Sequence, residues 1–285
     1  MLRQQKHLNH NLKKSIGVFD SGFGGLNILK GIIRELPNYN FIYLGDTARS
    51  PYGNRSQELI YEFTKQAVDF LFSQHCELII LACNTVSSEA LHKIQQEYLP
   101  KYYSNKKVLG VLIPAAEEAI LKTKNHRIGV IATEGTTQSQ SFVRELNKLN
   151  PKVKVWQQAC PLLVPIIESG EKNSAVLQII LEKYLQYLQN KNIDTLILGC
   201  THYGILEKQI KEIMGNKIRI ISEAKVIPKK LKNYLHRHSE IDNLLSKGGK
   251  LIFYSTDLTK KFEILGSKFF GQKIQVQKAF LDSRN

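Results

Sequence analysis

The stretch Leu78-Ile79-Ile80-Leu81-Ala82-Cys83-Asn84-Thr85 decides the predicted fold, because an aliphatic run leads directly to a thiol and then to small polar side chains. Such a run is typical of a buried strand in a parallel sheet, and the polar residues after it are typical of a helix start. The same design returns 117 residues later, with Cys200 in the place of Cys83, in Thr195-Leu196-Ile197-Leu198-Gly199-Cys200-Thr201-His202. The sequence therefore predicts two equivalent strands, each with a cysteine at its carboxyl end.

Cys83 and Cys200 are candidate catalytic residues because the pattern places each of them between the end of a strand and the start of a helix. A helix N-terminus and its free N–H groups favour negative charge, so we expect a lowered thiol pKa and a fraction of reactive thiolate at both positions. A single buried cysteine is more often a small structural hydrophobe. The matched pair, with polar residues after each thiol, favours the catalytic interpretation, in which two thiols act on a substrate from opposite sides.

A second repeated marker indicates an internal duplication. Ile128-Gly129-Val130 repeats Ile16-Gly17-Val18 at an offset of 112 residues, close to the offset of the two cysteines. Strand and helix patterns also alternate along the chain, with strands expected at residues 16–20, 40–44 and 78–82 and helices at residues 24–36, 58–72 and 87–98. The sequence therefore predicts an α/β fold in which two similar parallel-sheet domains, related by a pseudo-twofold duplication, face one central cleft.

The predicted domains are discontinuous in sequence. The pattern of the second half is complete near residue 224, yet a helical stretch at residues 227–236 and a strand at residues 251–254 remain. We expect this final segment to return to the first half. The first α/β domain would then comprise residues 1–112 plus 225–285, with Cys83, and the second would comprise residues 113–224, with Cys200.

The turn Asp20-Ser21-Gly22-Phe23-Gly24-Gly25 follows the first predicted strand and opens a helix. Free backbone N–H groups at such a turn can hold a carboxylate or a phosphate. No Gly-Lys-Ser/Thr follows, and Asn27 occupies the third glycine position of a dinucleotide fingerprint, so neither nucleotide motif is present. The glycines could equally serve only close packing of strand and helix. Asp20 is a stronger candidate, since a carboxylate at the end of an apolar strand has no packing role.

Length and composition fit a soluble protein of two domains without a metal site. The chain has 285 residues, 42% of them hydrophobic, and no apolar run long enough for a membrane span or a secretory signal, so we expect a cytoplasmic protein with no membrane partner. Its four cysteines form no CxxC pair and no zinc-like cluster with histidines. Neither a disulfide framework nor a metal site is therefore expected.

The formal charge of +15 is the one unusual feature of the composition. A basic surplus at the N-terminus and in the last third of the chain could attract nucleic acid. The sequence contains no zinc finger, RNP signature or recognisable helix-turn-helix to support this function. A solvated, lysine-rich surface is the favoured interpretation, and a nucleic-acid partner is not expected.

Five segments carry a resemblance to a known family. They span residues 16–206 in the family's order: Phe19-Asp20-Ser21-Gly22-Phe23-Gly24-Gly25-Leu26, Gly45-Asp46-Thr47-Ala48-Arg49-Ser50-Pro51-Tyr52-Gly53, Ala82-Cys83-Asn84-Thr85, Ala159-Cys160-Pro161-Leu162 and Leu198-Gly199-Cys200-Thr201-His202-Tyr203. In these the chain resembles the cofactor-independent aspartate/glutamate racemase superfamily, and within it the racemases of glutamate. It departs from the family pattern at Ile221-Ser222-Glu223, where an Asp-Ser is usual, and at Ala115-Ala116, which replaces a glycine-containing turn.

The resemblance implies interconversion of L-glutamate and D-glutamate without a cofactor. One thiolate would remove the α-proton while the opposite thiol delivers another, so that the two cysteines exchange the roles of base and acid. By the resemblance, Cys83 acts on D-glutamate with assistance from Asp20, and Cys200 acts on L-glutamate with assistance from His202. Glu168 matches a family carboxylate near the second thiol, although it could equally be a solvent-exposed residue at a helix end.

Candidate substrate-binding residues lie at the same edges of the predicted sheets. Neutral hydrogen bonds would come from the side chains of Ser21, Asn84, Thr85 and Thr201, beside Asp20 and His202. The turn at Tyr52 and Gly53 could present backbone N–H groups to a carboxylate, although Tyr52 could equally be a packing aromatic. No motif requires pyridoxal phosphate, so the carbanion would need hydrogen bonds in a dry, closed cleft.

Three functions remain to be compared. The first is racemisation of glutamate, which would supply D-glutamate for peptidoglycan. The second is racemisation of aspartate or another acid by the same two thiols, which a panel of substrates would distinguish. The third is a basic nucleic-acid-binding protein on a racemase fold, which steeply salt-dependent retention on DNA would reveal. The expected partner is a small-molecule substrate, and the sequence leaves open whether the chain forms a homo-oligomer.

Overall fold

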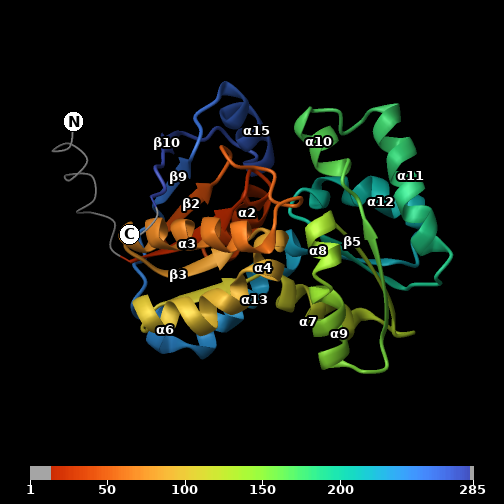
Figure 1. Ribbon diagram of the computed structural model, residues 1–285, viewed down its shortest axis with the longest axis horizontal. Helices are drawn as coiled ribbons and strands as arrows, with labels where there is room; N and C mark the ends of the chain where they lie inside the picture. Colours follow the sequence, from red (N-terminus) through yellow and green to blue (C-terminus); the bar gives the residue numbers. More distant parts are fainter. Residues whose placement is uncertain (1–13, 283–285) are drawn as a thin grey trace.

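Two parallel β-sheets organise the chain into two lobes that lie side by side (Figure 1). The structure is a computed structural model and describes residues 14–282. The basic N-terminal stretch noted in the sequence lies outside this range, apart from Lys14. No helix among the described residues is both long enough and apolar enough to cross a membrane.

The first lobe is built on a six-stranded sheet in the order β10-β9-β2-β1-β3-β4, in which every pair is parallel. Its central strands are buried along their whole length, as their apolar sequences predict. The strands are β1 (Ser15–Asp20), β2 (Phe41–Gly45), β3 (Cys76–Leu81), β4 (Lys107–Gly110), β9 (Leu251–Ser255) and β10 (Val276–Lys278). The C-terminal strand β9 pairs with β2, so the end of the chain does return to the first sheet.

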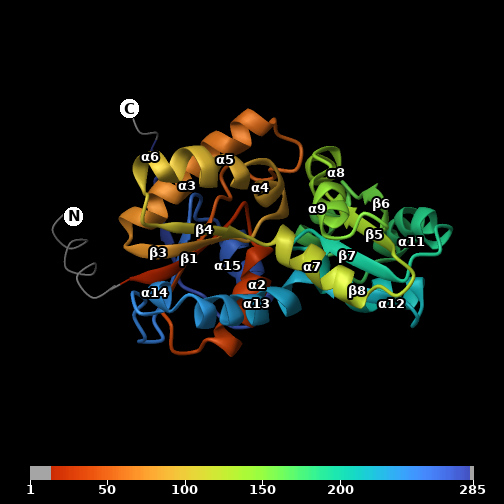
Figure 2. The ribbon, with the colours of Figure 1, turned by 90° about the horizontal axis from the view of Figure 1, so that it is seen from below.

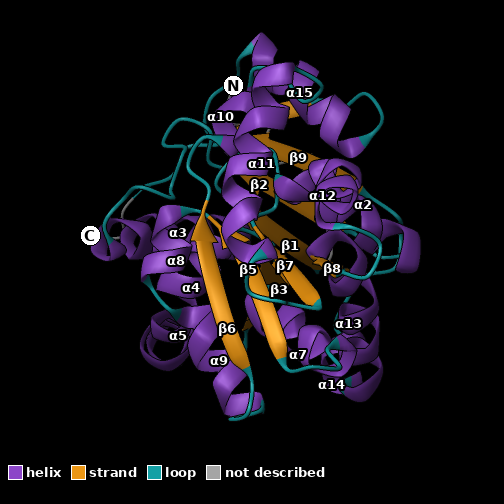
Figure 3. Ribbon diagram, turned by 90° about the vertical axis from the view of Figure 1, so that its right-hand side faces the viewer, coloured by secondary structure: helices purple, strands orange, loops and turns teal. Residues whose placement is uncertain are grey.

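The second lobe is built on a four-stranded parallel sheet in the order β6-β5-β7-β8. Its strands are β5 (Arg127–Ala132), β6 (Lys154–Ala159), β7 (Thr195–Gly199) and β8 (Arg219–Ser222), and Figure 3 shows this sheet with helices on both faces. The order repeats that of β2-β1-β3-β4 in the first sheet. The predicted α/β fold with two similar parallel sheets is therefore confirmed, and β3 and β7, which precede the two cysteines, occupy equivalent positions.

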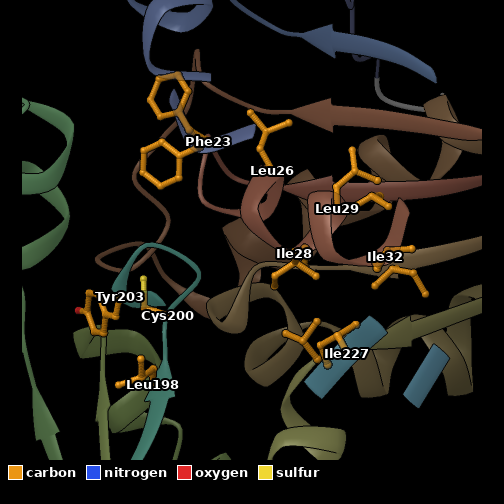
Figure 4. Packing of buried hydrophobic residues seen from close by; sticks show 14 of the residues in the cluster. Phe23, Leu26, Ile28, Leu29, Ile32, Leu198, Cys200, Tyr203 and Ile227 are labelled. Carbon is orange, nitrogen blue, oxygen red and sulfur yellow. The ribbon is translucent and has the colours of Figure 1, made fainter. Parts of the chain in front are cut away.

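Amphipathic helices cover both sheets. In the first lobe α2 (Gly25–Glu35) buries Leu26, Ile28, Leu29 and Ile32, and Figure 4 shows Leu26 and Leu29 on one side of the helix and Ile28 and Ile32 on the other. The other helices of this lobe are α3 (Gln57–Ser73), α4 (Asn84–Glu89), α5 (Leu91–Lys93), η1 (Ile94–Tyr98), α6 (Leu99–Tyr102), α14 (Ser239–Asp242) and α15 (Lys260–Phe270). Those of the second lobe are α8 (Glu134–Gln138), α9 (Ser141–Leu149), α10 (Leu163–Glu168), α11 (Ala175–Gln189), η2 (Tyr203–Leu206) and α12 (Glu207–Met214).

Two helices join the lobes. α7 (Leu112–Lys122) follows the last strand of the 2-1-3-4 unit, and α13 (Glu223–Arg237) follows the last strand of the second sheet. α13 packs against both α2 and α7, and Figure 2 shows it running beneath the first lobe from the boundary between the two. The chain thus crosses between the lobes twice.

The structure differs from the sequence prediction around both cysteines. The helix expected at residues 87–98 begins already at Asn84 and is divided into α4, α5 and the π-helical turn η1. Cys83 is therefore the residue that caps α4. Cys200 has no such helix directly after it, because only the short 3₁₀ helix η2 lies between it and α12.

Candidate active site

The Cys83 thiol lies at the carboxyl end of β3, where the backbone leaves the strand and enters α4. Its neighbour across the sheet is the turn that follows β1, since β1 and β3 are paired in parallel register. Ser21 in that turn places its Oγ 3.5 Å from the Cys83 Sγ. The residue Cys83 is only 7% exposed, so the thiol faces a site shielded from water.

Asp20 ends β1 and is fully buried next to this thiol. Its Oδ1 accepts a hydrogen bond from the Gly22 N–H at 2.8 Å, and its Oδ2 accepts one from the Thr201 hydroxyl at 3.3 Å. Burial raises the pKa of Asp20, while the positive field of His202 and these hydrogen bonds act in the opposite direction. Asp20 therefore connects the first thiol's edge with the loop that carries the second.

Cys200 occupies the equivalent place at the carboxyl end of β7. Its Sγ lies 3.9 Å from His202 Nδ1, and His202 Nε2 lies 3.1 Å from Glu168 Oε1 at the end of α10. Figure 4 shows Cys200 near Tyr203 and Leu198 of the same segment. A thiol, an imidazole and a carboxylate thus form a chain of contacts in which the carboxylate can orient the imidazole towards the thiol.

The expectation of lowered thiol pKa values is wrong for this structure. Burial, with the nearby Asp20 charge as a smaller cause, raises the pKa of Cys83 to about 11, against the hydrogen bond from Ser21. Burial likewise holds the pKa of Cys200 well above its usual range, although the His202 N–H opposes it. At Cys83 the loss of solvation therefore outweighs the favourable effect of the helix N-terminus.

Asn84 and Thr85, which follow Cys83, contact the second lobe directly. Asn84 Nδ2 donates to Glu223 Oε2 at 2.7 Å, and Thr85 Oγ1 lies 3.0 Å from Thr133 Oγ1. All of these residues except Thr133 are almost completely buried. The polar residues predicted for substrate binding therefore line the contact between the lobes.

Tyr52 and Gly53, the other two residues predicted to bind substrate, differ in their contacts. The Tyr52 side chain is buried against Phe19 and Phe63, and its hydroxyl donates to the carboxylate of Asp46. The side chain therefore anchors the turn from inside the first lobe. The Gly53 carbonyl accepts from the N–H of Gly135 at 2.8 Å, so the turn itself touches the second lobe.

The two carboxyl edges approach so closely at one glycine that a side chain has no room there. A Cβ on Gly24 would lie 2.1 Å from Thr201 Oγ1 and 2.7 Å from His202 Nδ1. The structure thus brings together Asp20, Ser21, Cys83, Asn84 and Thr85 of the first lobe with four residues of the second, Glu168, Cys200, Thr201 and His202. A separate cavity of about 660 Å³ between α12, β8 and α13 contains none of them.

Sequence reasoning missed Glu223 as part of this site. It was noted only as a departure from a family pattern, yet its carboxylate is buried and bonded to the residue next to Cys83. The signal was available, because Glu223 follows the apolar strand β8 as Asp20 ends β1, at the same kind of sheet edge. Among residues 14–282, no group of three or more His, Cys, Asp and Glu side chains is arranged to hold a metal ion.

Comparison with known proteins gives consistent matches over most of the chain. Residues 16–229 match the family described as Asp/Glu/hydantoin racemase. A glutamate racemase from Bacillus cereus is 38% identical over 265 residues, which cover 93% of this chain and 96% of that protein.

Two solved structures share the fold at similar identity. A glutamate racemase isoform from Bacillus anthracis superposes with a TM-score of 0.87 at 35% identity, covering 96% of this chain and 100% of that one. Glutamate racemase from Francisella tularensis, solved in complex with D-glutamate, gives a TM-score of 0.84 at 34% identity and covers 95% and 98% of the two chains. The chain therefore belongs to the Asp/Glu/hydantoin racemase family, in the branch formed by the glutamate racemases.

Proposed function

We propose that the protein interconverts L-glutamate and D-glutamate by proton transfer at the α-carbon between Cys83 and Cys200. The observation that carries this proposal is the equivalent placement of the two thiols, each at the carboxyl end of the third strand of a 2-1-3-4 unit. The Cys200 thiol is within electrostatic reach of the Cys83 thiol. Two such groups on opposite sides of one carbon can act in turn as base and acid.

Each thiol has its own supporting groups in this proposal. Cys83 removes the α-proton of D-glutamate, with Ser21 beside its sulfur and the Asp20 carboxylate nearby. Cys200 removes the α-proton of L-glutamate, with His202 in contact with its sulfur and Glu168 holding the imidazole. In either direction the second thiol is the proton donor, so a turnover leaves the net charge of the pair unchanged and moves the thiolate from one sulfur to the other.

Substrate binding brings the buried thiols the positive charge that they lack in the free protein. Burial keeps both thiols protonated because a thiolate is poorly solvated inside the protein. The α-ammonium group of an amino acid brings a positive charge into this site, and a positive charge nearby favours the thiolate. We therefore expect the reactive thiolate to form in the complex rather than in the free protein.

The carbanion formed at the α-carbon needs hydrogen bonds to the carboxylate that shares its charge. Ser21, Asn84, Thr85 and Thr201 provide neutral donors at the two sheet edges, and the turn at Gly53 adds backbone groups. Such donors stabilise charge most effectively where water is excluded. The low exposure of both thiols fits this requirement.

Closure of two domains is part of the proposal. We divide them as residues 1–112 plus 225–285 and residues 113–224, with α7 and α13 as the connections. Both thiols are only 7% exposed, so glutamate enters when the two carboxyl edges separate and reacts when they close again. The interlobe contacts Thr85 to Thr133 and Thr201 to Asp20 would break and re-form in each cycle.

In the cell, this reaction would supply D-glutamate for peptidoglycan. All four cysteines are free thiols, and the two-thiol chemistry needs them reduced, which favours the reducing cytoplasm. A panel of D-amino acids that includes aspartate tests the choice of substrate. We expect turnover of glutamate to exceed that of aspartate.

The direct test is circular dichroism of L-glutamate or D-glutamate incubated with the pure protein and no added cofactor. We expect the signal to decay to zero from either enantiomer, and a constant signal would refute the proposed function. Cys83→Ala and Cys200→Ala should each abolish the decay while retaining the far-ultraviolet spectrum of the folded protein. Racemisation by the Cys83→Ala variant at a near wild-type rate would refute the two-thiol mechanism.

An elimination-prone glutamate analogue tests which thiol serves which enantiomer, because elimination needs proton removal but no reprotonation. The Cys200→Ser variant should retain some elimination from the D-analogue through Cys83. The Cys83→Ser variant should prefer the L-analogue. Equal elimination of both enantiomers by each variant would reject the assignment of thiols to faces.

A further inference from the structure

A cavity of about 660 Å³ runs along β8, which is the edge strand of the second sheet. The consecutive residues 218–222 line it, and residues of α7, α12 and α13 complete its lining. Among residues 14–282, β8 pairs only with β7, so no strand covers its outer edge. The cavity therefore gives a ligand access to the free edge of a sheet.

The backbone of β8 presents hydrogen-bonding groups to this cavity. The Arg219 N–H donates to the Asp194 carbonyl at 2.9 Å, on the side of β7. Successive residues of a strand turn their N–H and C=O groups to opposite edges, so those of Ile220 face away from β7. An edge of this kind pairs readily with a further extended chain.

Basic side chains surround the same cavity. Six of them line it, from three helices and β8: Lys122, Lys211, Arg219, Lys225, Lys229 and Lys230. Among the described residues, the acidic side chains of the lining are Glu118 and Glu207, so the positive surplus is four. All the basic residues except Lys122 belong to the last third of the chain, where the sequence has its basic surplus. The cavity thus concentrates positive charge that the racemisation does not use.

Two of these cations have no carboxylate partner. Lys211 on α12 and Lys229 on α13 are exposed and form no ion pair within the described part of the chain. Lys225, by contrast, pairs with Glu207 at 2.5 Å. Unpaired cations on two helices of one cavity attract a ligand that carries several negative charges.

We propose that this cavity, the β8 groove, binds an acidic segment of a partner protein, which adds to β8 as a further strand. Carboxylates of the segment meet Lys211 and Lys229, and its main chain pairs with Ile220. A nucleic acid also carries negative charge, but its backbone has no N–H donor for the carbonyl of Ile220. This partner site is separate from the racemisation, since the lining of the β8 groove includes neither thiol.

Fluorescence anisotropy of a short labelled peptide that alternates valine with glutamate tests the proposal on the full-length protein. We expect saturable binding that weakens as the ionic strength rises, and no binding of a peptide that alternates valine with lysine. A third peptide has the acidic sequence with N-methyl groups on consecutive central residues, which removes N–H donors on both of its edges. Its Kd should be about tenfold higher or more, because several main-chain hydrogen bonds are lost.

Charge reversal locates the site. Lys211→Glu and Lys229→Glu should each raise the Kd of the acidic peptide about fivefold, since each removes an attraction and adds a repulsion. The matched control is Lys208→Glu, which is also on α12 and changes the net charge equally but lies outside the lining of the groove. This control should change the Kd less than about twofold. All three side chains are exposed, so the variants should fold, which thermal unfolding checks.

Several results would overturn the inference. Absence of peptide binding, or equal binding of the N-methylated peptide, would show that β8 does not accept a strand. Equal effects of all three substitutions, whether large or absent, would place the binding outside the β8 groove. Short duplex DNA that displaces the peptide and binds more tightly would assign the groove to a nucleic acid. The proposed racemisation is measured separately, by the assays of glutamate, and can fail or hold independently of peptide binding.

Discussion

Replacing Gly24 by alanine would test whether the two carboxyl edges must meet as closely as they do in this structure. A Cβ at this position would lie 2.1 Å from Thr201 Oγ1, 2.7 Å from Thr201 Cβ and 2.7 Å from His202 Nδ1. Rotation of the Thr201 hydroxyl would not relieve the clash, because the branch carbon itself is too near. The backbone of Gly24 is helical, with φ −58° and ψ −37°, so alanine suits the local conformation. The whole effect should therefore fall on the contact between the lobes.

The expected loss of activity in the Gly24→Ala variant follows from the cost of overpacking. Forcing an extra methyl group into a well-packed contact costs about 1–3 kcal/mol. If the lobes separate to avoid that cost, the closed form becomes roughly 5- to 150-fold less populated, since about 1.4 kcal/mol corresponds to a tenfold change. The kcat/KM for both enantiomers of glutamate should fall by the same factor. The melting temperature should change little, because Gly24 touches the second lobe at the carboxyl edge of the sheet and not in the hydrophobic core.

The rate at which the circular dichroism signal of each glutamate enantiomer decays gives kcat/KM. Thermal unfolding measures the stability of the variant. The matched control is Gly22→Ala in the same turn, where a Cβ would lie 3.4 Å from Ser50 Oγ and 3.9 Å from Glu168 Oε1, which are ordinary contacts. We expect near wild-type activity from this control. Full activity of Gly24→Ala would refute the argument that catalysis needs the closed contact, and a large loss of stability would show that the clash lies within a lobe.

Three further predictions concern buried groups. Tyr52→Phe removes the hydroxyl that donates to Asp46. It should lower the free energy of unfolding by about 1–2 kcal/mol with little change in the KM for glutamate. A raised KM with an unchanged free energy of unfolding would instead mean that the hydroxyl binds substrate. Glu223 has a folded-state pKa of about 8 against 4.5 in the unfolded chain, so its stabilising contribution is complete below pH 4.5 and is lost as the pH rises towards 8, by up to about 1.4 kcal/mol per pH unit. Glu223→Gln should therefore gain stability over wild type across that range in denaturant titrations, and a difference that is constant with pH would contradict this. Burial raises the pKa values of Cys83 and Cys200. Alkylation of both thiols by iodoacetamide near neutral pH should therefore be slower than alkylation of glutathione, and it should accelerate as the pH rises. Rapid alkylation of either thiol in the free protein would be inconsistent with the closed site.

Much of the fold could be predicted from local patterns. The apolar runs that end at Asp20 and Cys83 are strands because they are short, buried on both faces and followed by turn residues, and the structure has them as β1 and β3. The repeated motifs at Cys83 and Cys200 indicated a duplication, and the repeated strand order confirms it. The end of the chain returned to the first sheet because Leu251–Ser255 pairs with β2.

The electrostatics of the site could not be predicted in this way. A helix start after Cys83 suggested a lowered thiol pKa, but the pKa depends on how much water reaches the sulfur, and Cys83 is buried in the folded protein. The side chain of Tyr52 points towards Asp46 because it packs against Phe19 and Phe63, which are neighbours that no local pattern indicates. The 3₁₀ turn after Cys200 likewise has no distinct signal in the sequence.

The sequence by itself determined the strands, the duplication and the residue types that end each strand, because these depend on hydrophobic periodicity and on backbone chemistry within a few residues. Only the tertiary structure decided which of those residues meet. Thr201 touches Asp20, and Glu223 touches Asn84, across 181 and 139 positions of the chain. Such contacts arise where the two sheets bury their carboxyl edges against each other, and the free energy of that burial is a property of the joined surfaces and not of any local stretch.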